Sequence, residues 1–274
     1  MSDDSSKTTA AAEPLLPEEP ERSSEPVAKK LVPWGLWTAI IYTLFIFFAA
    51  QLAASLVVLL YPKLKGWDSA RATDWLNNSV PAQFWYVLLA ETITVASIWW
   101  YLRYRKVSLR IIGWRSLRLK DPLLATMGLL SYYVLFLFSY GVVSHFFHGL
   151  NTSQKQELGF DHVSGTLNLL LTFVSLVVLP PLAEETVFRG FLFTGLRRRL
   201  KPVGAALITS ALFATAHLQF GTGKPLLWVA ALDTFTLSLV LCYLRHKTDS
   251  LWPGILVHAL KNSVAFISLF LLHP

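Results

Sequence analysis

The sequence predicts an all-α protein, a polytopic membrane helical bundle with about seven transmembrane helices. The chain is 54% hydrophobic and only 15% charged, with a mean hydropathy of +0.48. Apolar windows long enough to cross a bilayer, about 20 residues each, recur along it, and Lys and Arg gather between them. An ordinary soluble domain is less apolar. The net charge of +7 comes with no basic face and no nucleic-acid-binding module, so we expect no nucleic-acid partner.

Seven apolar windows define the expected spans. They are residues 34–60, 82–102, 122–147, 163–196, 203–219, 226–244 and 250–272. The fourth window is overlong, and we expect Pro180 and Pro181 to break it. Backbone freed by such a break is tolerated at membrane depth only where protein or a cavity surrounds it. A functional site is therefore expected there.

Three parts of the chain are distinguished. Residues 1–30 are rich in Ser, Glu, Pro and Ala and lack a signal-peptide core, which predicts a disordered cytoplasmic tail. Residues 31–162 are assigned to N-terminal transmembrane helices and residues 163–274 to a catalytic helical core. The single cysteine, Cys242, cannot form an intrachain disulfide.

Positive charge predicts the orientation. Seven Lys and Arg lie in residues 103–120, four in 197–201, and Arg245 and Lys247 add two more. All three clusters fall on one side if the spans alternate. The positive-inside rule then places the amino terminus in the cytoplasm, and we expect an integral protein of a bacterial plasma membrane.

Two adjacent carboxylates, Glu184 and Glu185 in EETVFRG, are the most informative feature of the chain. Ionisable groups at membrane depth are costly and are functional candidates. Glu185 and Arg189 stand four apart, so on a helix they share a face and can pair. Glu184 remains available for chemistry.

Further polar residues are expected at a similar depth. The basic residues after or before each span mark one edge of the membrane. Helical rise then places Glu184 about 20 Å from Arg197, His217 about 24 Å from Lys201, and His258 about 17 Å from Lys247. Asn262 shares the helix face of His258.

These residues can support hydrolysis. Glu184 can take a proton from water, His217 can share it, and His258 with Asn262 can donate to the oxyanion that develops on a carbonyl. The alternative is that the polar side chains only hold helices together. Because the residues form motifs on three successive spans, we favour catalysis.

Other readings of the charged residues are weaker. The chain has no HExxH, GxGD or GxSG motif of other membrane proteases. Glu91 and Asp233 each lie about 18 Å from the basic end of their span. We expect them either to line the cavity or to neutralise Lys261. We favour pairing over catalysis for both, because an unpaired buried charge is expensive.

The motifs resemble the CPBP family, which contains the CAAX prenyl protease type 2 and bacteriocin-processing membrane proteases. The residues that carry the resemblance are EETVFRG at 184–190, FATAH at 213–217 and HALKN at 258–262. The resemblance covers about the last 110 residues. It implies a glutamate-dependent endopeptidase whose catalytic residues are Glu184, His217, His258 and Asn262. Glu185, Arg189 and Phe213 are then supporting residues.

The resemblance also indicates which cofactor and partners to consider. Glu184, His217 and His258 are the ligands if zinc is bound; we favour metal-free chemistry, since Asn262 supplies an alternative to Lewis-acid polarisation. The expected partners are the lipid bilayer and a membrane-associated peptide or protein substrate, prenylated or bacteriocin-type. The competing hypothesis is a noncatalytic scaffold or bacteriocin-immunity protein that uses the same pocket for binding.

Overall fold

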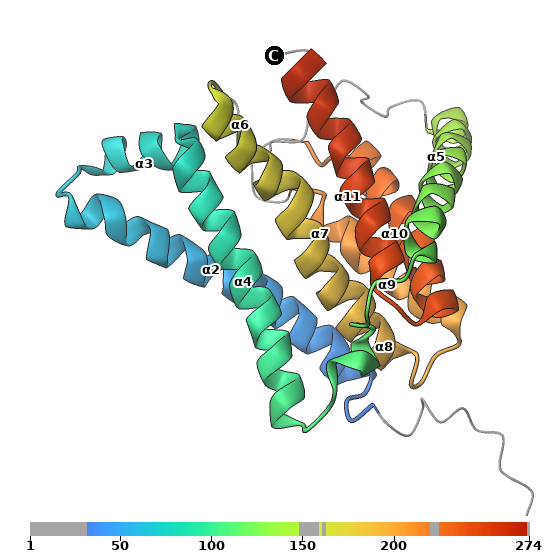
Figure 1. The fold of residues 1–274 in the computed structure, drawn as a ribbon. Helices are drawn as coiled ribbons and strands as arrows, with labels where there is room; N and C mark the ends of the chain where they lie inside the picture. Colours follow the sequence, from blue (N-terminus) through green and yellow to red (C-terminus); the bar gives the residue numbers. More distant parts are fainter. Residues whose placement is uncertain (1–31, 148–158, 161–162, 220–224, 273–274) are drawn as a thin grey trace, which may run out of the picture.

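The computed structural model describes residues 32–147, 159–160, 163–219 and 225–272, and every regular element in this part of the chain is helical. Figure 1 shows the long helices packed side by side as a bundle, with α2 and α4 on one flank and α5 on the other. The predicted all-α helical membrane bundle is confirmed. The predicted tail, residues 1–30, lies outside the described residues.

The helices follow the seven apolar windows closely. They are α2 (Leu36–Leu64), α4 (Val80–Tyr104), α5 (Lys120–Phe146), a composite fourth helix, α9 (Pro202–Ala216), α10 (Trp228–Thr248) and α11 (Trp252–Ile267), which a π segment, η4 (Ser268–Leu272), extends. The composite helix comprises α6 (Thr166–Phe173), η2 (Val174–Val178), α7 (Leu179–Glu184), η3 (Glu185–Leu192) and α8 (Phe193–Leu196). Two short elements, α3 (Ser69–Asn78) and the 3₁₀ turn η1 (Leu109–Ile112), were not expected from the apolar windows.

Five helices are long and apolar enough to cross a membrane: α2, α5, the composite helix, α10 and α11 with its extension. The protein is an integral membrane protein, but the predicted count of seven spans is not confirmed. The 25-residue α4 is long enough but less apolar, and α9 has only 15 residues, short of the roughly 20 that a crossing needs.

The expected break at Pro180 and Pro181 is absent, because the composite helix runs continuously from Thr166 to Leu196. A proline ring in an α-helix clashes with the carbonyl one turn earlier. The π segment η2 widens the helix immediately before the prolines, which relieves this clash locally. The prolines therefore change the backbone hydrogen bonding without ending the helix.

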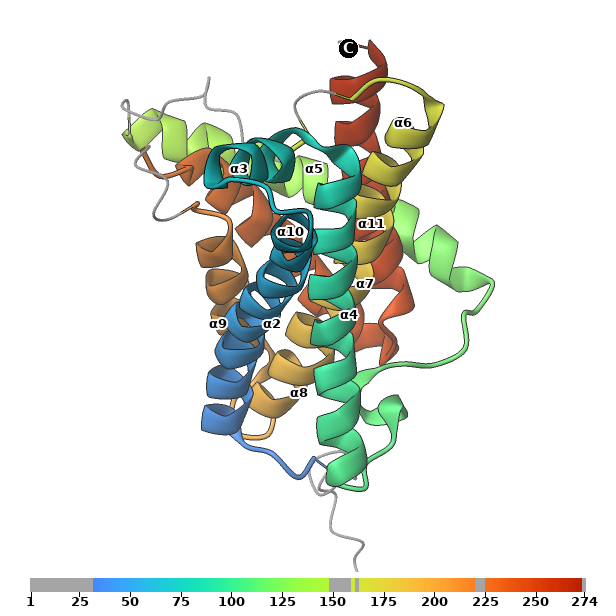
Figure 2. The same ribbon diagram turned by 90° about the vertical axis from the view of Figure 1, so that its left-hand side faces the viewer.

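A core around Trp34 fixes α2 to the composite helix. The Trp34 indole stacks on Phe191 with 4.7 Å between ring centroids, and its Nε1 donates to the Phe191 carbonyl at 3.2 Å. Gly195 lies one turn further along, where an added Cβ would stand 2.5 Å from Trp34 Nε1. In Figure 2, the lower part of α2 lies beside α8.

The three basic clusters lie at one end of the bundle, as the charge pattern predicted. The turn after α4 packs there against the junction between α10 and α11, where Arg245 Nη2 donates to Ile111 O at 3.0 Å and Leu251 N donates to Gly113 O at 3.0 Å. Gly113 has a φ of 96°, and a Cβ there would stand 2.8 Å from Arg245 Nε. Only glycine suits this position.

We expect Gly195→Ala to lower the free energy of unfolding by about 1–3 kcal/mol, because the methyl group forces Trp34 from its place. Gly204→Ala is the matched control: its nearest neighbour would be 3.9 Å from the added Cβ, so the gain in helix propensity should leave stability equal or higher. Thermal unfolding of the two detergent-solubilised variants measures the difference. Equal midpoints would show that the Trp34 contact does not define this interface.

Candidate active site

Glu185 and Arg189 form an ion pair inside the composite helix, with 2.8 Å between Arg189 Nη1 and Glu185 Oε1. The two side chains are 1% and 0% exposed, respectively. The pairing that their spacing predicted is confirmed. Because neither charge reaches water, each would be strongly unfavourable without the other.

Glu185 also faces the first turn of α11. An added Cβ on Gly254 would stand 3.1 Å from Glu185 Oε2, so glycine lets this helix approach the carboxylate closely. The amino-terminal end of a helix favours negative charge. The sequence analysis missed Gly254; its signal is the four-residue spacing that puts Gly254, His258 and Asn262 on one helix face.

His258 is held by Glu185, with 3.1 Å between His258 Nδ1 and Glu185 Oε1. Glu185 is an ionised acceptor because it pairs with Arg189, so we assign the Nδ1 proton as the donor in this hydrogen bond. The opposite nitrogen, Nε2, is then an acceptor in the neutral ring and a donor only in the charged ring. Glu185 therefore sets both the orientation and the tautomer of His258.

Glu184 lies on the other side of the His258 ring, with 3.8 Å between Glu184 Oε2 and His258 Nε2. This distance is too long for a direct hydrogen bond. Glu184 Oε2 is buried and makes no hydrogen bond to another described residue, although the side chain as a whole is 24% exposed. The carboxylate can thus take a proton from a water or substrate group that enters beside His258.

His217 joins the group from α9, where it follows the last helical residue. Its Nδ1 lies 2.9 Å from Phe213 O, and a carbonyl only accepts, so we assign the proton to Nδ1. Its ring packs against Phe213, which also contacts the His258 ring, and no hydrogen bond joins His217 to Glu184 or His258. Its Nε2 is left as an acceptor.

Phe213 connects the charged residues to both histidines. Its buried ring packs 4.7 Å from the His217 ring and 6.0 Å from the His258 ring, measured between centroids. The Arg189 guanidinium lies over the Phe213 ring, 4.4 Å from its centroid, within the range of a cation–π interaction. Phe213 therefore packs against Arg189 and both histidines.

Asn262 has a structural contact that the sequence analysis did not foresee. Its Nδ2 donates to Leu176 O at 2.9 Å. In an α-helix this carbonyl would accept from residue 180, and in a π-helix from residue 181. Both are prolines without an N–H, so Asn262 satisfies a carbonyl that the composite helix cannot. One amide hydrogen remains for another acceptor.

Lys261 and Asp233 form an ion pair at 2.8 Å, as predicted for Asp233. Asp233 also accepts from the Tyr132 hydroxyl. Glu91 instead lines a cavity of about 490 Å³ between α4 and α7, together with Ala183 and Thr186, the neighbours of the two glutamates. The pairing that we favoured for Glu91 is wrong, because Lys261 pairs with Asp233. Glu91 lines a cavity, as the alternative allowed, but this cavity lies beside the catalytic cluster.

Zinc ligation has limited support from this geometry. The Nδ1 contacts of both histidines leave Nε2 free, as in many metal sites. Within the described ranges, however, no three His, Cys, Asp or Glu side chains gather closely enough to hold one metal ion. The donor set does not fit a zinc site with three protein ligands, so the steps considered below use the side chains alone.

Comparison with known proteins identifies the part of the chain that contains this cluster. Residues 166–264 match the family model described as type II CAAX prenyl endopeptidase Rce1-like. This segment is therefore similar to that family. The match confirms the family resemblance found in the motifs, and it includes Glu184, His217, His258 and Asn262.

One curated relative is similar over part of its length. An uncharacterized 24.3 kDa protein of Escherichia coli is 36% identical over 93 residues, which are 33% of this chain and 41% of that protein. The chain thus matches about two-fifths of the relative's length. No solved structure matches the chain.

We expect Glu185→Met and Arg189→Met each to lower the free energy of unfolding by about 3–5 kcal/mol, because each leaves one buried charge unpaired. The double variant should lose much less than the sum, since it leaves neither charge behind. Unfolding of the three variants in mixed micelles gives the coupling free energy. Additive losses would mean that the buried pair contributes nothing specific.

Proposed function

We propose that this protein is an intramembrane endopeptidase that uses Glu184 to activate the water that hydrolyses a peptide bond. The observation that carries the proposal is the position of Glu184 Oε2, buried without a hydrogen bond and 3.8 Å from a histidine whose other nitrogen is fixed. Glu185 Oε2 also makes no hydrogen bond, but the Glu185 side chain is 1% exposed, whereas the Glu184 side chain is 24% exposed and can be reached by water.

The reaction follows from these positions. Glu184 takes a proton from water as the water oxygen bonds to the scissile carbonyl carbon. The carbonyl oxygen becomes an oxyanion. As the carbon–nitrogen bond breaks, the proton held by Glu184 passes to the leaving amine. The free Nε2 of His217 can share this proton, because that nitrogen accepts when Nδ1 donates to Phe213.

Stabilisation of the oxyanion depends on His258 and Asn262. His258 Nδ1 donates its hydrogen bond to Glu185, so His258 donates to the oxyanion from Nε2 when the ring is charged. Asn262 has one amide hydrogen left after its bond to Leu176 O. Arg189 and Glu185 act through His258 by fixing its position.

The substrate follows from the location of the site. We propose a membrane-associated peptide or protein, because Glu184, His258 and Asn262 lie on helices that are long and apolar enough to cross a membrane. The resemblance of the motifs favours a prenylated or bacteriocin-type substrate. The bacterial relative supports a bacterial plasma membrane. The basic end of the bundle is assigned to the cytoplasm, which places the amino terminus there.

Replacing Glu184 with Gln should lower processing about 10²–10⁴-fold, because the amide cannot take the proton from water. His217→Ala and His258→Ala should be similarly inactive. Peptides that accumulate in cells expressing Glu184→Gln, compared with cells expressing the unaltered protein, identify the substrate. The reaction is then measured with purified proteins.

Thermal unfolding of the Glu184→Gln variant provides the control, and it should match the unaltered protein. Full processing by this variant, prepared identically so that contaminating proteases are equal, contradicts the proposal. A zinc chelator separates the two chemistries: metal-free hydrolysis survives chelation, whereas a zinc enzyme loses activity and regains it when zinc is added.

The structural and catalytic contributions of Asn262 can also be separated. Asn262→Ala should cost about 1–3 kcal/mol of stability by leaving Leu176 O unsatisfied. Adding Pro180→Ala supplies an N–H that can bond to this carbonyl, so the double variant should regain stability. If Asn262 binds the oxyanion, activity stays low in the double variant. Recovery of both stability and activity would assign Asn262 a structural role alone.

A further inference from the structure

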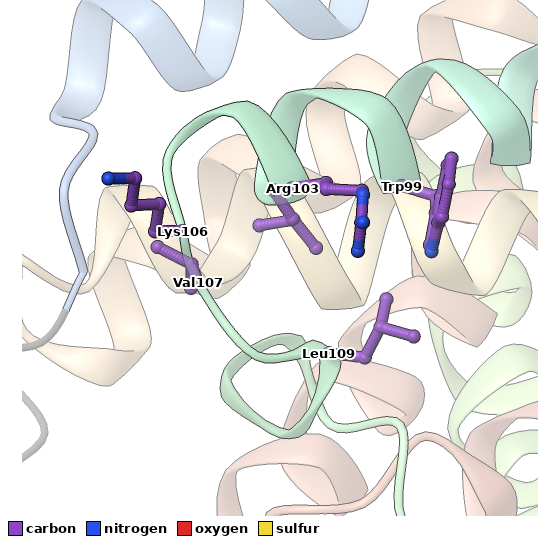
Figure 3. A pocket seen from close by; sticks show the side chains of 6 residues that line it. Trp99, Arg103, Lys106, Val107 and Leu109 are labelled. Carbon is purple, nitrogen blue, oxygen red and sulfur yellow. The ribbon is translucent and has the colours of Figure 1, made fainter.

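A second site lies at the basic end of α4, outside the catalytic cluster. A cavity of about 500 Å³ opens there, and Figure 3 shows Arg103 beside Trp99 and across from Leu109, with Lys106 at the far end of the lining residues and its amine directed away from Arg103. Trp99 and Leu109 also line the cavity that contains Glu91. The two cavities therefore adjoin along α4. We call them together the α4 groove.

The α4 groove has a charged end and an apolar interior. Arg103 and Lys106 carry the positive charge at one end, whereas the wall beyond Trp99 is formed by apolar side chains that include Val95, Ala96 and Ile98. Glu91 lies at the opposite end, twelve residues before Arg103. Helical rise makes this separation about 18 Å, close to the roughly 15 Å depth of one leaflet's hydrocarbon. The groove thus extends about as far as one acyl chain.

The two cations of the α4 groove lack protein anions. Neighbouring basic residues are occupied: Arg105 donates to Pro33 O at 3.0 Å, and Arg118 lies 3.5 Å from the Asp121 carboxylate. Arg103 contacts the Trp99 ring, 5.7 Å from its centroid. Within the described part of the chain, neither Arg103 nor Lys106 has a carboxylate within ion-pair distance. Both remain available for an anionic ligand.

The backbone at Lys106 gives a second, independent indication. Lys106 has a φ of 54° and follows the cap of α4, where Lys106 N donates to Arg103 O at 3.0 Å and Val107 N to Leu102 O at 2.8 Å. This is a Schellman motif, in which glycine usually occupies the left-handed position. A lysine there is strained relative to glycine. Such strain is found where a side chain serves a ligand or a catalytic step.

From this arrangement we propose that the α4 groove binds an anionic phospholipid of the surrounding bilayer. Its phosphate lies beside the Arg103 guanidinium, and the flexible Lys106 side chain turns toward it from the orientation in Figure 3. Trp99 lies at the level of the headgroup, and one acyl chain follows the apolar wall toward Glu91. Basic pockets between transmembrane helices bind anionic headgroups in this way, and tryptophan is favoured at the membrane interface. The proposal is independent of the proteolytic activity.

Binding can be measured by native mass spectrometry of the full chain released from micelles that contain phosphatidylglycerol or phosphatidylcholine with identical acyl chains. Phosphatidylglycerol should be retained in preference. Arg103→Gln with Lys106→Gly should weaken its retention about tenfold or more, because two phosphate contacts are lost. Lys106→Gly alone should weaken binding while keeping or raising the thermal midpoint, since it removes backbone strain. This last variant separates lipid binding from folding.

Matched controls test each part of the groove. Arg198→Gln with Arg199→Gln removes the same charge from exposed residues at the same end and should leave retention unchanged. Ala96→Phe should weaken retention by obstructing the acyl chain while both cations remain. Equal retention by all variants, or equal loss in the Arg198 and Arg199 control, overturns the proposal. So does displacement of the lipid by millimolar inorganic phosphate, which would indicate a phosphate site without an acyl-chain component.

Discussion

The buried contact between Arg189 and Glu185 is the constraint on which the rest of the candidate site depends. Arg189 pairs with Glu185 Oε1, and the same oxygen holds the Nδ1 side of His258. That contact turns Nε2 toward Glu184, the carboxylate proposed as the base. Because Arg189 pairs with Glu185 and not with Glu184, the two adjacent glutamates have different roles. One is enclosed by its partners, and the other retains an oxygen for chemistry.

The composite helix shows a similar coupling between backbone and site. Consecutive prolines remove the donors that Leu176 O would use in either an α- or a π-helix. Asn262 supplies the missing donor from α11. The same helix carries Gly254, which admits Glu185, and His258, which binds it. One face of α11 thus contacts both the Leu176 carbonyl and Glu185 Oε1. These contacts hold α11 and the composite helix in a fixed register.

The α4 groove connects this interior to the basic end of the bundle. Glu91 and Thr186 lie at its inner end, and Thr186 follows Glu185 directly in the sequence. Thr186 also accepts from Trp114 Nε1 at 3.2 Å, which ties the turn after α4 to the composite helix. A lipid in the groove would contact the helix that carries both glutamates. The proposed lipid site and catalytic site are consequently separate in chemistry but share a wall.

The sequence alone determined the class of protein, the positions of the helices, the basic end and the Glu185–Arg189 pair. These features depend on apolar length, charge distribution and spacing within a single helix, all of which are local. The tertiary structure decided how His258, Asn262 and Gly254 contact the composite helix, because those contacts join residues that are far apart in the chain. It also decided that Pro180 and Pro181 do not end the helix, since the donor that compensates for them comes from α11. The rise of each helix predicted that the polar groups lie at a similar depth. Only the packing of the helices against one another decided which atoms are in contact.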